Sequence, residues 1–154
     1  MLRVILAAAM TDKLKLARAC ADAMWKGDTA SQSLGMKLEE MRPGYARLSM
    51  RITRDMVNGR DNCHGGIIFT LADSSFAYAC NSHNQYAVAV GCNIDFLAPG
   101  QVGDVLVATA VEQGRVGRTG VYDVRIENQE GALVATFRGK SVTVKGHWVE
   151  ASDQ

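Results

Sequence analysis

The chain has 154 residues, of which 47% are hydrophobic, and its formal charge is +1 from 17 basic and 16 acidic residues. This length supports one hydrophobic core and leaves no room for a second domain of ordinary size. A balanced charge without blocks of like charge excludes the strongly basic surface of a nucleic-acid-binding protein and an acidic tail. Partners must therefore be inferred from individual sites.

The first ten residues, MLRVILAAAM, place Arg3 before a short apolar run. A signal peptide has this order, but a run of about seven residues is at the lower limit of a signal-peptide hydrophobic region. The alternative is an upstream start or a frayed N-terminal extension before Met10. No run in the sequence reaches the roughly 18 apolar residues that a membrane span needs.

A helix is predicted over residues 12–26, because apolar residues recur there at helical spacing and charged residues mostly take the other side. A polar loop is predicted over 27–33, followed by a strand over 34–41 that ends in the turn 42–44. Apolar and polar residues then alternate over 46–52, which predicts a strand with one buried face.

Residues 65–82 have apolar side chains all round a helical wheel, which is typical of a buried helix. Four strands joined by short, turn-rich segments are predicted after it, over residues 86–97, 104–113, 119–128 and 133–144. Strands joined by such turns pair antiparallel, which excludes a parallel βαβ array. The sequence therefore predicts an α+β fold in which one antiparallel sheet wraps a buried helix.

Four cysteines, at positions 20, 63, 80 and 92, form no CxxC pair, and three histidines, at 64, 83 and 147, are scattered. A domain of this size needs no disulfide, so reduced thiols and a cytoplasmic location are predicted. No metal site is predicted, since no histidine lies at ligand spacing from a cysteine. Cys63 beside His64 suggests a Cys-His nucleophile, but sequence neighbours usually point apart and no third orienting group is evident.

Asp73 places a carboxylate in the middle of the buried helix. A serine or a backbone group could satisfy it, but ionised carboxylates are rarely buried without a partner or a function. The helix starts at His64-Gly65-Gly66, and the first N–H groups of a helix can hold an oxyanion. Attack on a carbonyl needs such donors and a carboxylate that activates water or attacks directly. Gly65 and Gly66 are therefore the candidate oxyanion donors, and Asp73 is the candidate acid.

Gly65 and Asp73 are eight residues apart, which corresponds to about 12 Å along a helix. One helix cannot present both groups to one carbonyl. If two copies pack these helices antiparallel across a twofold axis, Asp73 of one copy lies near Gly65 of the other. The chemistry thus predicts a homodimer with two equivalent, shared sites.

Three parts of the sequence resemble a known family: the buried helix and its approach, NGRDNCHGGIIFTLADSSFAYACNS; the strand GCNIDFLAPGQVGD; and the segments TGVYDVRIENQ and FRGKS. They are similar to the hotdog-fold acyl-CoA thioesterases of the PaaI type. The resemblance covers roughly residues 33–145, which implies an N-terminal extension with a helix over 1–32, a hotdog domain over 33–145 and a tail of uncertain order over 146–154.

This resemblance implies hydrolysis of aryl-acyl-CoA thioesters, phenylacetyl-CoA or hydroxyphenylacetyl-CoA, to the free acid and CoA. It implies no cofactor, an active site at a dimer interface, and dimers that pair into a tetramer. The preferred acyl group and the form of the tetramer stay open, as does the role of Asp73 as general base or as nucleophile.

The resemblance also implies roles for single residues. Asn58 matches an asparagine that orients the nucleophilic water or the acid, although NGRDN is also an ordinary turn composition. His64 is expected to position the loop or the thioester, or else to cap the helix. Some related enzymes carry a serine or threonine on the strand after the helix, where this chain has Val88-Ala89-Val90.

Substrate contacts are expected in two places. Arg115, Arg118 and Thr119 lie in a glycine-rich hairpin whose side chains and amides suit the phosphates of coenzyme A. The alternative is that the arginines are simply exposed to solvent, which is more common in such hairpins. Phe76 and Phe96 could line an acyl pocket, or they could belong to the core.

Two other functions are compatible with the sequence. A hotdog hydratase or dehydratase would use His64 and Asp73 on an enoyl or β-hydroxyacyl chain, but the HGG turn suits an oxyanion site better. A non-catalytic acyl-CoA-binding module would use the same tunnel, but binding alone needs no buried acid.

Overall fold

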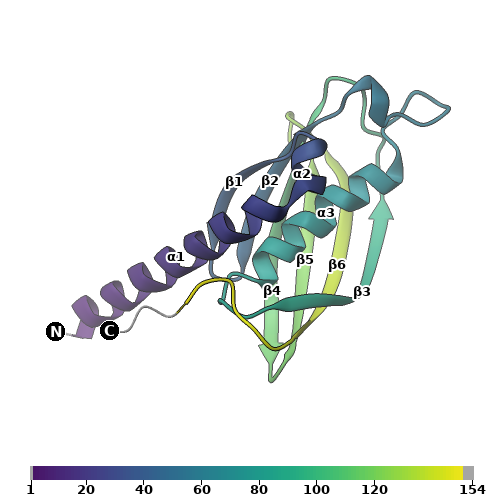
Figure 1. Ribbon diagram of the computed structural model, residues 1–154. Helices are drawn as coiled ribbons and strands as arrows, with labels where there is room; N and C mark the ends of the chain where they lie inside the picture. The colour runs from purple at the N-terminus through teal and green to yellow at the C-terminus, as the bar shows by residue number, and fades with distance from the viewer. Residues whose placement is uncertain (1, 151–154) are drawn as a thin grey trace.

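The computed structural model describes residues 2–150, with side chains described from residue 7. One six-stranded antiparallel sheet, in the order β1-β2-β4-β5-β6-β3, curves around helix α3 (Figure 1). The elements are α1 (Leu2–Gly27), α2 (Thr29–Ser33), β1 (Lys37–Arg42), β2 (Tyr45–Arg51), the 3-10 helix η1 (Arg54–Met56), α3 (Gly65–Cys80), β3 (Ala87–Phe96), β4 (Val105–Val116), β5 (Thr119–Glu127) and β6 (Leu133–Thr143). The predicted α+β architecture, an antiparallel sheet around a central helix, is confirmed.

The core lies between α3 and the inner face of the sheet. Buried and less buried residues alternate along β4 and β5, as expected for strands with one covered face. Phe76 of α3 packs against Tyr122 and Phe137, with ring centroids 5.5 and 5.8 Å apart. Gly139 of β6 makes room for this ring, because a Cβ at that position would lie 2.8 Å from it. This close packing fixes the sheet side of α3.

The predicted boundaries shift near the N-terminus. Helix α1 begins at Leu2, so the extension before Met10 has a helical backbone. The predicted loop over 27–33 contains the short helix α2, because Asp28 accepts a hydrogen bond from the Ser31 amide at 3.1 Å and caps it. Gly35 then adopts a left-handed conformation (φ +67), so β1 starts three residues later than predicted.

Helix α1 belongs to the same core as the sheet. Ala17, Cys20 and Ala21 of α1 are buried in one cluster with Met36. Figure 1 shows α1 running beside α3 and β1, with its N-terminal half projecting past the sheet. The boundary expected near residue 32 therefore separates no independent cores. Within the described residues, no helix combines the length and the apolar character needed to cross a membrane.

The C-terminal segment is fixed against the end of α3. Trp148 donates its indole N–H to Asn81 at 2.7 Å and packs edge-on against Tyr86, with ring centroids 4.8 Å apart. The side-chain oxygen of Asn84 accepts the amides of Trp148 and Val149 at 3.1 and 3.0 Å. The expected tail is thus anchored as far as Val149, and residues 151–154 lie outside the described residues.

Strand β3 forms one edge of the sheet, and within residues 2–150 it pairs only with β6. It and the residue after it expose several large apolar side chains, namely Val88, Val90, Phe96 and Leu97. A ten-residue edge strand with an apolar surface is a ready site for pairing, and proteins usually cover such an edge.

Candidate active site

The start of α3 leaves one amide available to a ligand. His64 is the N-cap, and its Nδ1 accepts a hydrogen bond from the Gly66 amide at 3.0 Å. The Gly65 amide donates to no acceptor in the described part of the chain. It lies at the positive end of the helix dipole, where it can hold a developing oxyanion. Of the two predicted donors, Gly65 is therefore accessible and Gly66 is engaged by the cap.

A cavity of about 400 Å³ opens beside Gly65, and ten residues line it: Asn58, Arg60, Asn62, Cys63, Gly65, Ile68, Phe96, Leu97, Ala98 and Pro99. The Phe96 ring lies against the helix start, since a Cβ on Gly65 would be 3.1 Å from it. Phe96 is nevertheless 52% exposed, so its ring can also meet a ligand. This glycine allows both the ring and a carbonyl group to approach the backbone closely.

Asn58 organises the turn that leads into this helix. Its side-chain oxygen accepts the amides of Arg60 and Asn62 at 2.9 and 3.4 Å. Its backbone amide donates to the Asn62 carbonyl at 2.8 Å, which closes the turn. The side-chain N–H group has no acceptor among the described residues, and Asn58 lines the cavity beside Gly65. The turn and the functional interpretations of Asn58 are therefore compatible.

Asp73 lies two turns further along α3 and is half-buried. Burial raises the pKa of its carboxyl group above the ordinary value. Its carboxylate makes no hydrogen bond within the described residues, and Ser74 beside it bonds to Ser31 instead. An unpaired acid with a raised pKa is poised to accept a proton, which is what a general base near neutral pH requires.

The two halves of the site do not meet in one chain. Asp73 and Gly65 are eight residues apart on a single helix, or about 12 Å. Asp73 instead lies near the middle of β3: the pKa of the Cys92 thiol is raised by burial and then by the Asp73 carboxylate. Phe96, four residues further along β3, packs against Gly65. Asp73 and the Gly65 amide, the two halves of the site, therefore both lie on the side of α3 that is next to the edge strand β3.

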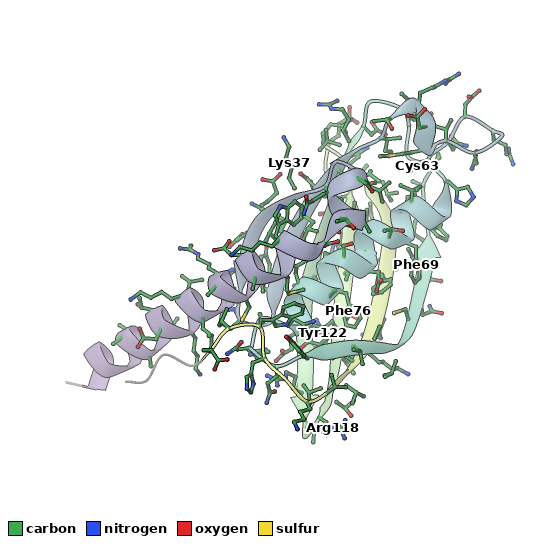
Figure 2. All side chains as sticks on the ribbon, in the orientation of Figure 1. Lys37, Cys63, Phe69, Phe76, Arg118 and Tyr122 are labelled. Atoms are coloured by element: carbon green, nitrogen blue, oxygen red, sulfur yellow. The ribbon has the colours of Figure 1, made fainter. Side chains whose placement is uncertain are left out.

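The predicted substrate-binding residues are divided by the structure. Phe76 is 1% exposed and packs against the sheet, so of its two predicted places the structure favours the core. Arg118 donates to the Thr143 carbonyl at 2.9 Å, and Arg115 donates to Gln85 at 3.1 Å. Figure 2 shows Arg118 at the opposite end of the molecule from Cys63, the neighbour of His64.

Neither Cys63 nor a second cavity offers an alternative active site. Burial raises the pKa of the Cys63 thiol to about 11, so it stays protonated near neutral pH and is a poor nucleophile. A larger cavity of about 640 Å³ lies on the sheet face away from α3, but its Asp123 and Arg138 are paired with each other at 2.6 Å. Within the described residues, no group of three His, Cys, Asp or Glu side chains could hold a metal ion.

Sequence patterns missed the one charged residue among the described residues that line the cavity. Arg60 lines it together with Gly65, and no carboxylate in the described part of the chain pairs with it, whereas the nearby Arg54 pairs with Asp61 at 3.3 Å. A charged residue in a turn is ordinary, so no pattern singles it out.

Comparisons with known proteins identify the family and the fold. The thioesterase superfamily matches residues 61–135. Acyl-coenzyme A thioesterase PaaI of Escherichia coli K12 is 48% identical over 126 residues, which cover 82% of this chain and 90% of that protein. The structure of the E. coli PaaI protein from the phenylacetic acid degradation operon matches with a TM-score of 0.86 at 46% identity, over 87% of this chain and 97% of that chain.

A hypothetical thioesterase from Streptococcus pneumoniae TIGR4, solved with coenzyme A, matches with a TM-score of 0.70 at 28% identity, over 73% of this chain and 90% of that chain. These matches extend over the helix, the edge strand and the sheet, and they confirm the hotdog fold. The chain therefore belongs to the PaaI-type acyl-CoA thioesterases of the thioesterase superfamily, and it is a thioester hydrolase.

Proposed function

We propose that the protein hydrolyses aryl-acyl-CoA thioesters, with phenylacetyl-CoA or a ring-hydroxylated derivative as substrate, to the free acid and CoA. The observation that carries this proposal is the combination, on one helix, of an available amide at Gly65 and a half-buried, unpaired carboxylate at Asp73. The thioester carbonyl binds to the Gly65 amide of one copy, and Asp73 of a second copy attacks or activates water.

Each step of the reaction has a group to perform it. In the general-base route, Asp73 takes a proton from water while the oxygen forms a bond to the carbonyl carbon. The resulting oxyanion is held by the Gly65 amide and the helix dipole. The C–S bond then breaks, and the CoA thiolate leaves and takes up a proton. In the nucleophilic route, Asp73 bonds to the same carbon, CoA leaves, and water hydrolyses the mixed anhydride.

A homodimer through β3 supports the shared site. Two β3 edges that pair antiparallel would extend the sheet and cover the exposed apolar residues of both copies. The same twofold axis would set the two α3 helices antiparallel, which brings Asp73 of one copy toward Gly65 of the other. Pairing of two such dimers into a tetramer is a proposal drawn from the resemblance, and a cytoplasmic location is one drawn from the cysteine pattern.

The aryl preference has two supports. The exposed Phe96 ring beside Gly65 offers an aromatic surface to an aryl group one or two bonds from the thioester carbonyl. The relative named PaaI belongs to a phenylacetic acid degradation operon. Arg115, Arg118 and Thr119 belong to the β4–β5 hairpin, and Figure 2 shows Arg118 at the end of the molecule opposite Cys63. In the proposed dimer, the hairpin of the second copy would therefore face the CoA phosphates.

Thiol release tests the proposal directly. Purified protein is incubated with phenylacetyl-CoA, hexanoyl-CoA and crotonyl-CoA in the presence of a thiol-reactive dye, and Asp73→Asn and Asp73→Ala serve as controls that keep the fold. We expect turnover of phenylacetyl-CoA with the highest kcat/KM, and a loss of at least about a hundredfold in both variants.

Three outcomes would contradict the proposal. Preference for the alkyl substrate would refute the aryl preference, and equal activity of the variants would make Asp73 a structural residue. Loss of the enoyl absorbance of crotonyl-CoA without thiol release would instead establish a hydratase.

A further inference from the structure

The corner between α1 and α2 is hydrogen-bonded to the helix that carries Asp73. The Ser31 hydroxyl of α2 lies 2.9 Å from the Ser74 hydroxyl of α3. One turn further, the Tyr78 hydroxyl donates to the Asp28 carboxylate at 3.0 Å. Ser74 and Tyr78 are four residues apart, so they share one face of the helix, and both bonds join that face to the corner.

This corner is held by several contacts, and half of its bonded side chains are buried. Asp28 uses one carboxylate oxygen to cap α2 through the Ser31 amide, at 3.1 Å, and the other to accept the Tyr78 hydroxyl. Ser31 and Tyr78 are each 1% exposed. Trp25 packs beside Tyr78, with ring centroids 6.2 Å apart. Burial first, and then the Asp28 hydrogen bond, raise the pKa of Tyr78, so its hydroxyl stays a donor.

Asp73 depends on such outside support because its own carboxylate makes no hydrogen bond within the described residues. The direction in which it points is therefore set by the position and rotation of its helical turn. The sheet side of that turn is fixed by Phe76, three residues further on. The other side is fixed where Ser74, the next residue in the chain, meets Ser31. A displacement of about 1 Å in such a group is enough to impair catalysis strongly.

We propose that Asp28 and Ser31 are positioning residues for the catalytic carboxylate, and that they act on Asp73 through Tyr78 and Ser74. This inference rests on the proposed function, because it assigns the N-terminal extension a part in the rate of thioester hydrolysis. The corner holds Asp73 in the orientation that attack on the thioester requires, and it leaves substrate binding to the cavity at Gly65.

A double-mutant cycle tests the Ser31 and Ser74 pair. The variants are Ser31→Ala, Ser74→Ala and the combination of both, with Ser74→Thr as the conservative replacement that keeps the hydroxyl. Ser33→Ala is the matched control, because the Ser33 hydroxyl bonds only to the Ala30 carbonyl of its own helix. Serine to alanine favours helix, so the variants are expected to fold. Values of kcat and KM are measured by thiol release from phenylacetyl-CoA, and the fold and the oligomer are checked by circular dichroism and light scattering.

We expect each single variant to lower kcat by about five- to twentyfold while KM changes by less than about twofold. The double variant should be no slower than the slower single variant, since both remove the same bond. Ser74→Thr should restore at least half of the wild-type kcat, and Ser33→Ala should leave it unchanged.

Unchanged kcat in folded Ser31→Ala and Ser74→Ala would overturn the positioning role, and so would losses that multiply in the double variant. Tyr78→Phe gives a second, independent test, because it removes only the hydroxyl that binds Asp28. It should lower kcat without a change in KM, and an unaltered kcat would refute the part assigned to Asp28. A wild type without turnover would overturn the proposed function itself, which distinguishes the two failures.

Discussion

His64 binds the Gly66 amide through its Nδ1 atom at 3.0 Å, and this bond decides which amide of α3 a substrate can reach. The cap uses one of the first N–H groups of the helix and leaves that of Gly65. The same glycine lies under the Phe96 ring. The helix start therefore combines a donor for an oxyanion with an aromatic surface for an acyl group.

Gly65→Ala is expected to impair catalysis. The added methyl group would lie 3.1 Å from the Phe96 ring and would narrow the approach to the Gly65 amide. We expect kcat/KM to fall by at least about tenfold, because the amide is retained but the carbonyl can no longer approach it closely, and full loss of an oxyanion donor costs about a hundredfold or more. Gly59→Ala is the matched control in the neighbouring turn, where a Cβ would meet nothing within 4 Å. Steady-state kinetics of the two variants check the prediction, and similar rates for both would contradict it.

Asp73→Asn is expected to stabilise the fold while it abolishes activity. Burial raises the folded-state pKa of Asp73 above its ordinary 3.8, so the folded protein holds this proton more tightly than the unfolded chain. Its contribution to stability is full below pH 3.8 and is lost as pH rises through the raised pKa. Asparagine does not ionise and avoids this loss.

The gain in unfolding free energy of Asp73→Asn should therefore be near zero below pH 3.8 and largest at neutral pH. Urea denaturation of both proteins at a series of pH values, at equal protein concentration, measures this difference. A variant that is less stable than the wild type at neutral pH would show that Asp73 has a stabilising structural partner.

Two phenylalanines should separate stability from specificity. Phe76→Ala removes a ring buried between Tyr122 and Phe137 and should cost about 3 to 5 kcal/mol of unfolding free energy. Phe96→Ala removes a half-exposed ring and should cost much less, but it should raise KM for phenylacetyl-CoA by roughly fivefold, since one aromatic contact contributes on the order of 1 kcal/mol. Denaturation and kinetics with aryl and alkyl substrates check both, and an equal rise in KM for hexanoyl-CoA would refute an aryl contact.

The edge strand offers a test of assembly. Val90 on β3 is 59% exposed, and Val90→Asp would place a charge in the proposed dimer interface. We expect this variant to shift toward a monomer in light scattering and to lose activity in proportion to the dimer lost. Met10 is 73% exposed on the N-terminal half of α1, which projects past the sheet, so Met10→Asp should change neither property. A fully active Val90→Asp monomer would argue against a shared site.

Much of the fold could be predicted because one physical signal dominates each element. Period-two alternation identifies β2, and an apolar surface all round identifies the buried helix α3. Helix α2 was missed because its five residues are too few to show a period, and its N-cap, Asp28, also suits a turn. The fixed position of Trp148 was missed because it depends on Asn81 and Asn84, which are more than sixty residues away in the sequence.

Site residues could be predicted where the residue type and its position in the sequence both indicate a chemical role. A buried acid and a glycine pair at a helix start are visible in the sequence, and these gave Asp73 and Gly65. The division between Phe76 and Phe96 was not visible, because both are aromatic residues in apolar segments and only the packing tells which one faces the core. The engagement of Gly66 likewise depends on the side-chain rotamer of His64.

The most direct test of the shared site is complementation between two variants that are impaired in different halves of the site. Gly65→Ala keeps the acid and impairs the amide, whereas Asp73→Asn keeps the amide and removes the acid. Mixed dimers are formed by co-expression with two affinity tags, and their thiol release from phenylacetyl-CoA is compared with that of each parent. A shared site predicts that a random mixture recovers about one quarter of wild-type activity, because half of the dimers are mixed and one of their two sites is intact. Activity no higher than the mean of the two parents would mean that both groups act within one chain, and would contradict the account.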